Sequence, residues 1–239
     1  MVYEKRLDGR KFDELRPIEA RAGIIKRADG SGYFRIGKSS AYAAVYGPRE
    51  LYPRFLQNPT KGVLRCHYNM MPFSSVGGRV RPGGSRRSKE ISMVTNKALL
   101  SVMELDDFTN AVIDVFIELD QTDAGTRCAG ISAASIALAD AGIVMKDLVS
   151  AVAIGVVDNS VVADLNYDEE AYDKGDVADI PFAVIPSTGK ISLLQMDGII
   201  TKEQLNEAME LAQKKCGEIN RIQRAALKDK FKAGENHAE

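Results

Sequence analysis

The chain has 239 residues, of which 45% are hydrophobic and 27% are charged, and its formal net charge is −1. These values are ordinary for a soluble globular protein with one large domain or two smaller ones. The total charge does not call for nucleic acid as a partner, so any basic binding surface has to arise from local clustering.

Three cysteines, Cys66, Cys128 and Cys216, lie far apart, and the chain has no CxxC pair and only two histidines. This pattern argues against a disulfide framework and a zinc site, and it fits a reducing, intracellular setting. The first ten residues lack the apolar core of a signal peptide, and the longest apolar-rich run, 148–157, is too short to span a bilayer. We therefore expect a cytoplasmic protein that makes no membrane contact.

The first half of the chain is predicted to be rich in strands. Apolar segments separated by turn residues predict strands over 18–26, 33–36, 41–46 and 63–71. Four glycines and a proline within 75–88 predict a mobile loop, and apolar residues at helical spacing predict a helix over 89–105. Alternation then predicts a half-buried strand over 111–120.

The second half begins near residue 146, after a small-residue helix over 128–141 that stops at Gly142. Turn and capping signals predict a hairpin of strands 149–157 and 161–165, strands 180–185 and 191–196, and a long final helix opened by Thr201 and Gln204. Strands followed by helices, twice over, predict an α+β fold with two β-then-α layers. We expect domains over 1–146 and 147–239.

Residues 120–142 predict an anion site, because a strand runs into a glycine turn that opens a helix. Exposed N–H groups and the helix dipole attract anions at such a point. Gly125 lets the backbone approach a ligand closely, and Arg127 adds a guanidinium suited to phosphate. The alternative is a structural turn before a helix of small residues that only packs tightly.

A basic loop forms a second candidate site, with Arg79, Arg81, Arg86, Arg87 and Lys89 against one acid, Glu90. Arg86 and Arg87 fall at a helix start, where cations oppose the dipole, and a bound polyanion would offset that preference. The alternative is a solvated basic loop.

The preceding strand carries Arg65, His67 and Tyr68. Arg65 could hold a phosphate and Tyr68 could stack on a base. By spacing, Arg65 and His67 share one face of the strand and Tyr68 takes the other, so Tyr68 could equally be a core residue.

The acidic segment 164–179 ends in Asp179, directly before an apolar strand. Cleavage of a phosphodiester needs a proton for the departing sugar oxygen, and a carboxyl group whose pKa is raised by a neighbouring carboxylate can supply it. The same pair could hold Mg²⁺. The alternative is a solvated acidic loop.

Together these motifs resemble the RNase PH family of phosphorolytic 3′→5′ exoribonucleases. The resemblance rests on 6–18 as an opening motif, 123–127 as a phosphate loop, and Asp164-Leu165 leading to Asp173 and Asp179, which are six residues apart. Finer similarities at 45–50, 68–75 and 85–92 favour the catalytic ring subunits of the archaeal exosome.

The resemblance implies an RNase PH-like fold and a reversible reaction, in which inorganic phosphate attacks an RNA 3′ end and releases nucleoside diphosphates. It implies phosphate on Gly125, Thr126, Arg127 and Cys128, with RNA on Arg65, Tyr68, Arg86 and Arg87. Asp173 would be the general acid, and Asp179, with Asp173, would hold Mg²⁺ or orient the phosphate.

Two departures from the family pattern stand out. Cys128 replaces a small hydroxyl residue common in relatives, and the acidic loop is longer, so the choice of Asp173 over Asp168 or Asp176 depends on the six-residue spacing.

The resemblance also implies a hexameric ring, a trimer of heterodimers with an inactive paralogue, beneath RNA-binding cap subunits. Three alternatives stay open: a hydrolytic nuclease, a non-catalytic RNA-binding ring subunit, and a phosphorylase of bacterial type that trims tRNA 3′ ends.

Overall fold

The computed structural model describes residues 3–76, 78–173 and 175–235. Its first half forms a five-stranded sheet in which β4 and β5 run parallel and all other neighbours are antiparallel. In spatial order its strands are β1 (Ile18–Ala22), β2 (Gly30–Ile36), β3 (Ser39–Glu50), β5 (Ala111–Gln121) and β4 (Val63–Met70).

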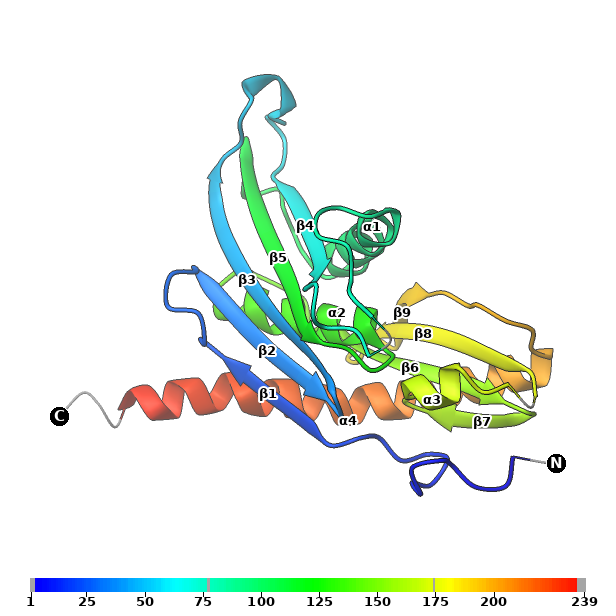
Figure 1. Cartoon of the computed structure of the whole chain (residues 1–239). Helices are drawn as coiled ribbons and strands as arrows, with labels where there is room; N and C mark the ends of the chain where they lie inside the picture. The colour runs from blue at the N-terminus through cyan, green and yellow to red at the C-terminus, as the bar shows by residue number, and fades with distance from the viewer. Residues whose placement is uncertain (1–2, 77, 174, 236–239) are drawn as a thin grey trace.

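The second half forms a four-stranded antiparallel sheet. Its order is β7 (Ser160–Ala163), β6 (Ser150–Val157), β8 (Val177–Ile185) and β9 (Lys190–Leu194). The helices are η1 (Arg54–Leu56), α1 (Arg86–Leu100), α2 (Thr126–Asp140), α3 (Tyr167–Glu170) and α4 (Lys202–Glu235). Figure 1 shows α1 beside β4, and α4 running past both sheets. The predicted α+β fold is confirmed.

The small residues of α2 allow the backbones of helix and sheet to come close. A Cβ atom added at Gly30 of β2 would lie 2.2 Å from the backbone nitrogen of Ala141, and one at Gly32 would lie 2.4 Å from the carbonyl oxygen of Ala133. No side chain fits in that space, so β2 packs directly on the helix. One hydrophobic core then runs from the first sheet through α2 into the second sheet.

Local signals explain where several elements begin and end. α1 begins at Arg86, three residues before the predicted start, because Ser85 and Ser88 form a reciprocal capping box. The predicted hairpin is confirmed, and both of its turn residues, Asp158 and Asn159, have positive φ. The capping box at Thr201 and Gln204 is also confirmed.

The expected strand over 18–26 is shorter and ends at Ala22, because Gly23 takes a φ of +72° and turns the chain away from the sheet. The acidic segment is not all loop, since Asn166 and Glu169 cap the short helix α3. Within the part of the chain that the structure describes, no helix has the length and apolar character needed to cross a membrane.

A buried ion pair joins the N-terminal segment to the second half of the chain. Arg6 donates from Nε and Nη2 to the two carboxylate oxygens of Glu169, at 2.7 and 2.6 Å, and both side chains are fully buried. The hydroxyl of Tyr3 donates to Glu169 as well, at 2.8 Å. These contacts fix α3, which ends one residue later.

A second buried pair extends this network to the turn before α2. Arg16 donates from Nε and Nη2 to the carboxylate of Asp164, at 2.8 and 2.6 Å, and from Nη1 to the carbonyl oxygen of Asp123, at 2.5 Å. The Asp123 carboxylate accepts the N–H of Tyr167, the first residue of α3, at 2.9 Å. The turn and α3 are therefore held by the same set of contacts.

Replacement of Glu169 by Gln should destabilise the fold strongly. Burial acts to raise the pKa of Glu169, but the hydrogen bonds and charge of Arg6 outweigh it, and the pKa lies below its ordinary value. A lowered pKa means that this stabilisation is present at neutral pH and is lost as pH falls through the folded-state pKa. Loss of one partner leaves a buried charge unpaired, so we expect the free energy of unfolding at pH 7 to fall by about 3–5 kcal/mol.

Urea denaturation would measure this loss. The matched control is Glu19→Gln, which breaks the exposed pair between Glu19 and Arg21 and should change the stability by less than about 1 kcal/mol. Equal effects of the two substitutions would contradict the role of the buried pair.

Candidate active site

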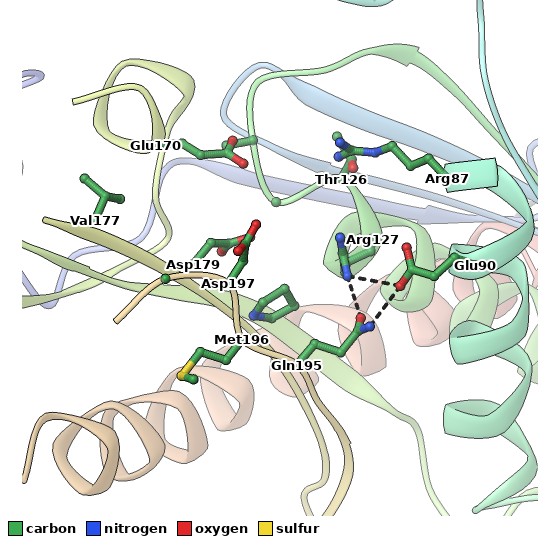
Figure 2. Close-up of a pocket in the computed structure, with 14 residues that line it drawn as sticks. Arg87, Glu90, Thr126, Arg127, Glu170, Val177, Asp179, Gln195, Met196 and Asp197 are labelled. Atoms are coloured by element: carbon green, nitrogen blue, oxygen red, sulfur yellow. Dashed lines mark hydrogen bonds and ion pairs between the residues drawn. The ribbon is translucent and has the colours of Figure 1, made fainter. Parts of the chain in front are cut away.

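A cavity of about 500 Å³ lies where the start of α2, the start of α1 and the ends of β8 and β9 meet. Figure 2 shows Arg87 and Arg127 on one side of it, with Glu90 beside Arg127, and Glu170, Asp179 and Asp197 on the other side. The lining residues are Arg87, Glu90, Ala124, Gly125, Thr126, Arg127, Glu170, Val177, Asp179, Pro181, Gln195, Met196, Asp197 and Gly198.

The turn predicted to bind phosphate opens into this cavity. Ala124 and Gly125 have φ values of +54° and +62°, and Gly125 occupies the N-cap position of α2 without a side-chain cap. The N–H groups of Thr126 and Arg127 in the first turn have no intrahelical acceptors, as at every helix start. The turn thus presents backbone donors to the cavity at the positive end of the helix dipole.

Cys128 does not line the cavity. Its N–H donates to the carbonyl oxygen of Gly125 at 3.1 Å, and its side chain is 3% exposed. Burial raises the pKa of the Cys128 thiol to about 12. The structure therefore brings Gly125, Thr126 and Arg127 to the cavity and puts Cys128 beneath them in the core.

Arg127 is held by two residues from separate parts of the chain. Its Nη1 atom donates to Oε1 of Gln195 at 2.5 Å and lies 3.6 Å from Oε1 of Glu90. Gln195 in turn donates from Nε2 to Glu90 at 2.9 Å. This triangle, drawn with dashed lines in Figure 2, fixes the guanidinium above the turn.

The two arginines at the start of α1 are separated by the helix. Arg87 lines the cavity and Arg86 does not, although both are exposed. Adjacent residues on a helix point about 100° apart, so one face of α1 can supply only one of them to the cavity.

Arg65 and Tyr68 lie on opposite faces of β4, as their spacing predicts. Arg65 forms a bidentate pair with the buried carboxylate of Asp114, at 2.6 and 2.8 Å, away from the cavity lining. Tyr68 is 4% exposed and lies next to Gly130 of α2. The ring therefore takes the core position, which the sequence left open as the alternative to stacking on a base.

The acidic side of the cavity combines Asp179, Asp197 and Glu170. Asp179 at the start of β8 and Asp197 after β9 exchange backbone hydrogen bonds of 2.8 and 2.9 Å. Glu170 reaches the same space from the end of α3. Asp173, which the six-residue spacing selects, is exposed and is not among the lining residues. The six-residue spacing is present in the sequence, but the loop before β8 leaves Asp173 outside the cavity lining.

Burial raises the pKa of Asp179 to about 6, and the charge of Glu170 acts in the same direction while Arg127 opposes it. The Oδ1 atom of Asp179 is buried without a hydrogen-bond partner in the described part of the chain. Asp179 is therefore a carboxyl group that can hold a proton near neutral pH.

The donor set fits Mg²⁺ only if other ligands complete it. Among the described residues, no group of three or more His, Cys, Asp or Glu side chains could hold a metal ion on its own. Mg²⁺ in proteins commonly takes one or two carboxylates and completes its shell with water and substrate phosphates. Asp179 and Asp197 offer such a partial set, and the unpartnered oxygen of Asp179 is suited to it.

Four lining residues were missed as site residues by sequence reasoning. Glu90 stands out in the sequence as the one acid of the basic loop, and Glu170 belongs to the acidic segment. Gln195 and Asp197 follow β9 and carry no local signal, because only the pairing of β8 with β9 brings them to the cavity.

Comparison with known proteins places this geometry in a family. The model of domain 1 of the 3′ exoribonuclease family, RNase PH, matches residues 14–144, and the model of its domain 2 matches residues 147–215. The chain belongs to the RNase PH family. RNase PH relatives include the protein named exosome complex component Rrp41 from Methanopyrus kandleri, 53% identical, over 95% of this chain and 93% of the relative.

A second relative of that name, from Archaeoglobus fulgidus, is 48% identical over 93% of this chain and 86% of its own length. Among solved structures, rice Rrp46 superposes with a TM-score of 0.82 at 25% identity, covering 93% of this chain and all of the other. A chain of the Archaeoglobus fulgidus exosome with RNA bound to the active site has a TM-score of 0.76 at 20% identity, covering 91% of this chain and 92% of that chain. The RNase PH-like fold is confirmed.

Asp179→Asn should become more stabilising as pH rises. The folded-state pKa of Asp179 is about 6, above the unfolded value near 3.8. The native state therefore binds the proton more tightly than the unfolded state, and wild-type stability falls as pH rises from 3.8 to 6 and beyond. Asparagine cannot ionise. Its stability advantage over wild type should therefore increase by about 2 kcal/mol between pH 4 and pH 7. Urea denaturation at both pH values measures this difference, and a constant difference would contradict the raised pKa.

Proposed function

We propose that this protein is the catalytic subunit of an exosome and degrades RNA from the 3′ end by phosphorolysis. The observation that carries the proposal is one cavity in which a helix start and two arginines face a cluster of carboxyl groups that includes Asp179, whose pKa is raised. The family and the high identity to proteins named as exosome components support the assignment.

Inorganic phosphate binds at the turn of Ala124 and Gly125, where the N–H groups of Thr126 and Arg127 and the Arg127 guanidinium converge. These donors are in place before the reaction, because Gln195 and Glu90 hold Arg127 in position. Preorganised donors that face developing negative charge commonly contribute about 2.7–4 kcal/mol each to catalysis.

Arg87 holds the terminal phosphodiester of the RNA beside the bound phosphate. Both reactants are anions, so their approach is opposed unless positive groups lie between or beside them. Arg86 points elsewhere, and its exposed position suits contact with RNA farther from the 3′ end.

The proton for the departing 3′ oxygen comes from the carboxyl pair of Asp179 and Glu170. Burial raises the pKa of Asp179, and the charge of Glu170 raises it further, so Asp179 can carry this proton. Glu170 thus takes the part of the second acid that the sequence spacing assigns to Asp173.

Mg²⁺ would be held by Asp197, joined by Asp179 once Asp179 has given up its proton. Four carboxyl groups line the cavity against two arginines, and their full ionisation would repel both reactants. A divalent cation supplies charge neutralisation at the phosphate oxygens when bound. The protein's own residues supply the carboxylates, and water and phosphate complete the shell.

The subunit works in a hexameric ring with an inactive paralogue, beneath RNA-binding cap subunits. The relatives' name as components of an exosome complex supports an assembly of several subunits.

The reverse reaction tests the chemistry independently of RNA choice. With excess nucleoside diphosphate and the partner present, the enzyme should lengthen RNA 3′ ends and release orthophosphate, whereas a hydrolytic nuclease or a non-catalytic ring subunit would not.

Glu170→Gln should lower the rate of phosphorolysis by about 10²–10⁴-fold, because it removes one member of the carboxyl pair that supplies the proton, and general acid–base catalysis is commonly worth that much. Asp173→Asn is the matched control, because it removes a carboxylate three residues further along the same loop and outside the cavity lining. Release of nucleoside diphosphate from a short labelled RNA measures both rates. A large loss in Asp173→Asn with little loss in Glu170→Gln would contradict this assignment.

Arg87→Ala should weaken RNA binding and reduce the salt dependence of the binding constant. Loss of one contact to a single-stranded phosphate should reduce the log–log slope by about 0.7. Lys97→Ala removes an exposed positive charge from the other end of α1 and serves as control. Fluorescence anisotropy over a salt series gives both slopes, and equal slopes for the two variants would count against Arg87.

A further inference from the structure

Glu90 is a carboxylate beside the arginine of an anion site, which calls for a physical explanation. Its Oε1 atom lies 3.6 Å from Arg127 and accepts the amide of Gln195 at 2.9 Å. A glutamate here repels any anion that comes to Arg127, so a site built only for maximal anion affinity would not contain it. The Glu90 side chain is 39% exposed and lines the cavity, so it meets the ligand space directly.

The contacts of Glu90 leave one acceptor available. Arg127 and Gln195 both approach Oε1, and no residue that the structure describes donates a hydrogen bond to Oε2. An ionised carboxylate can only accept hydrogen bonds. Oε2 can therefore interact favourably with a ligand oxygen only if that oxygen carries a proton.

Gln195 holds this acceptor in a fixed place. Its carbonyl oxygen accepts from Arg127 at 2.5 Å while its amide donates to Glu90. One planar amide thus sets the spacing between the guanidinium that donates to the anion and the carboxylate that accepts from it. Figure 2 shows the three side chains gathered at the basic side of the cavity.

We infer that Glu90, positioned by Gln195, makes the anion site selective for a protonated oxyanion, and so for phosphate over sulfate. Phosphate near neutral pH carries at least one O–H group, which donates to Oε2 while its other oxygens accept from Arg127 and the turn. Sulfate has the same shape but carries no proton at this pH. One of its oxygens and Oε2 of Glu90 would therefore face each other as two acceptors without a hydrogen between them. A binding site rejects a competing ligand most effectively when that ligand would leave polar groups of the site without hydrogen-bond partners.

This inference rests on the proposed function, since it assigns the discrimination of the same phosphate site. It adds a specificity-determining residue, Glu90, and a positioning residue, Gln195, neither of which has to move a proton in the reaction. Arsenate keeps a proton near neutral pH, and it should therefore be accepted as phosphate is.

Calorimetric titration of the full chain, in Mg²⁺ buffer at pH 7.5, with orthophosphate and separately with sulfate tests the inference. The quantity of interest is the ratio of the sulfate Kd to the phosphate Kd. In Glu90→Gln this ratio should fall by at least about tenfold, the equivalent of one hydrogen bond to a charged group. The fall should come mainly from tighter sulfate binding, because the repulsion is gone.

Glu104→Gln is the matched control, since it neutralises an exposed glutamate paired with Lys146 on the surface, and its ratio should equal that of wild type. Glu90→Ala gives a second variant without any amide at this position, and its ratio should fall too. Sulfate inhibition of phosphorolysis should rise in parallel in both Glu90 variants.

The possible failures are distinguishable. Phosphate binding to wild type with the same ratio in Glu90→Gln and Glu90→Ala would overturn this inference and leave the proposed function standing. Failure of phosphate to bind wild type at all would overturn the proposed function and this inference with it.

Discussion

The buried pairs of arginine and carboxylate between the N-terminal segment and the second half of the chain hold the rest of the structure in place. Arg6 binds Glu169 and Arg16 binds Asp164, and both pairs are almost completely shielded from water. Charges so buried are tolerated only with complete hydrogen bonding, which permits very few arrangements. The chain is thereby constrained to bring residues about 150 positions apart into one geometry.

This constraint reaches the cavity through backbone contacts. Arg16 holds the carbonyl of Asp123, one residue before the strained turn, and Glu169 lies directly before Glu170. The turn at Ala124 and Gly125 and the acidic side of the cavity are therefore positioned by the same buried network. In this cavity, positive donors face clustered carboxyl groups, and the two sides attract each other. Rigid support is needed to keep them apart.

Most of the fold could be predicted from the sequence, and the reasons are local. Alternation in 111–120 and the small residues of 128–141 identify β5 and α2, and the capping box at Thr201 marks the start of α4. Gly125 and Arg127, which line the cavity, could be singled out because the helix start that they belong to lies in the same stretch of sequence. Residues whose structural role depends on neighbouring residues in the sequence were therefore predictable.

The residues that sequence reasoning missed or misplaced depend on contacts between distant segments. Tyr68 has a strand position that suits either a core or a binding role, and only the packing of α2 against β4 decides between them. Gln195 and Asp197 reach the cavity through the pairing of β8 with β9. Spacing alone pointed to Asp173, but the loop before β8 folds so that α3 presents Glu170 instead.

We expect that orthophosphate itself attacks the RNA from the turn at Gly125. Tracing the label from ³²P-orthophosphate, with the assembled protein and an unlabelled RNA, tests this most directly. The account predicts that the label appears in the terminal phosphate of released nucleoside diphosphates, and that none does so with Arg127→Ala. Release of unlabelled nucleoside monophosphates would contradict the account.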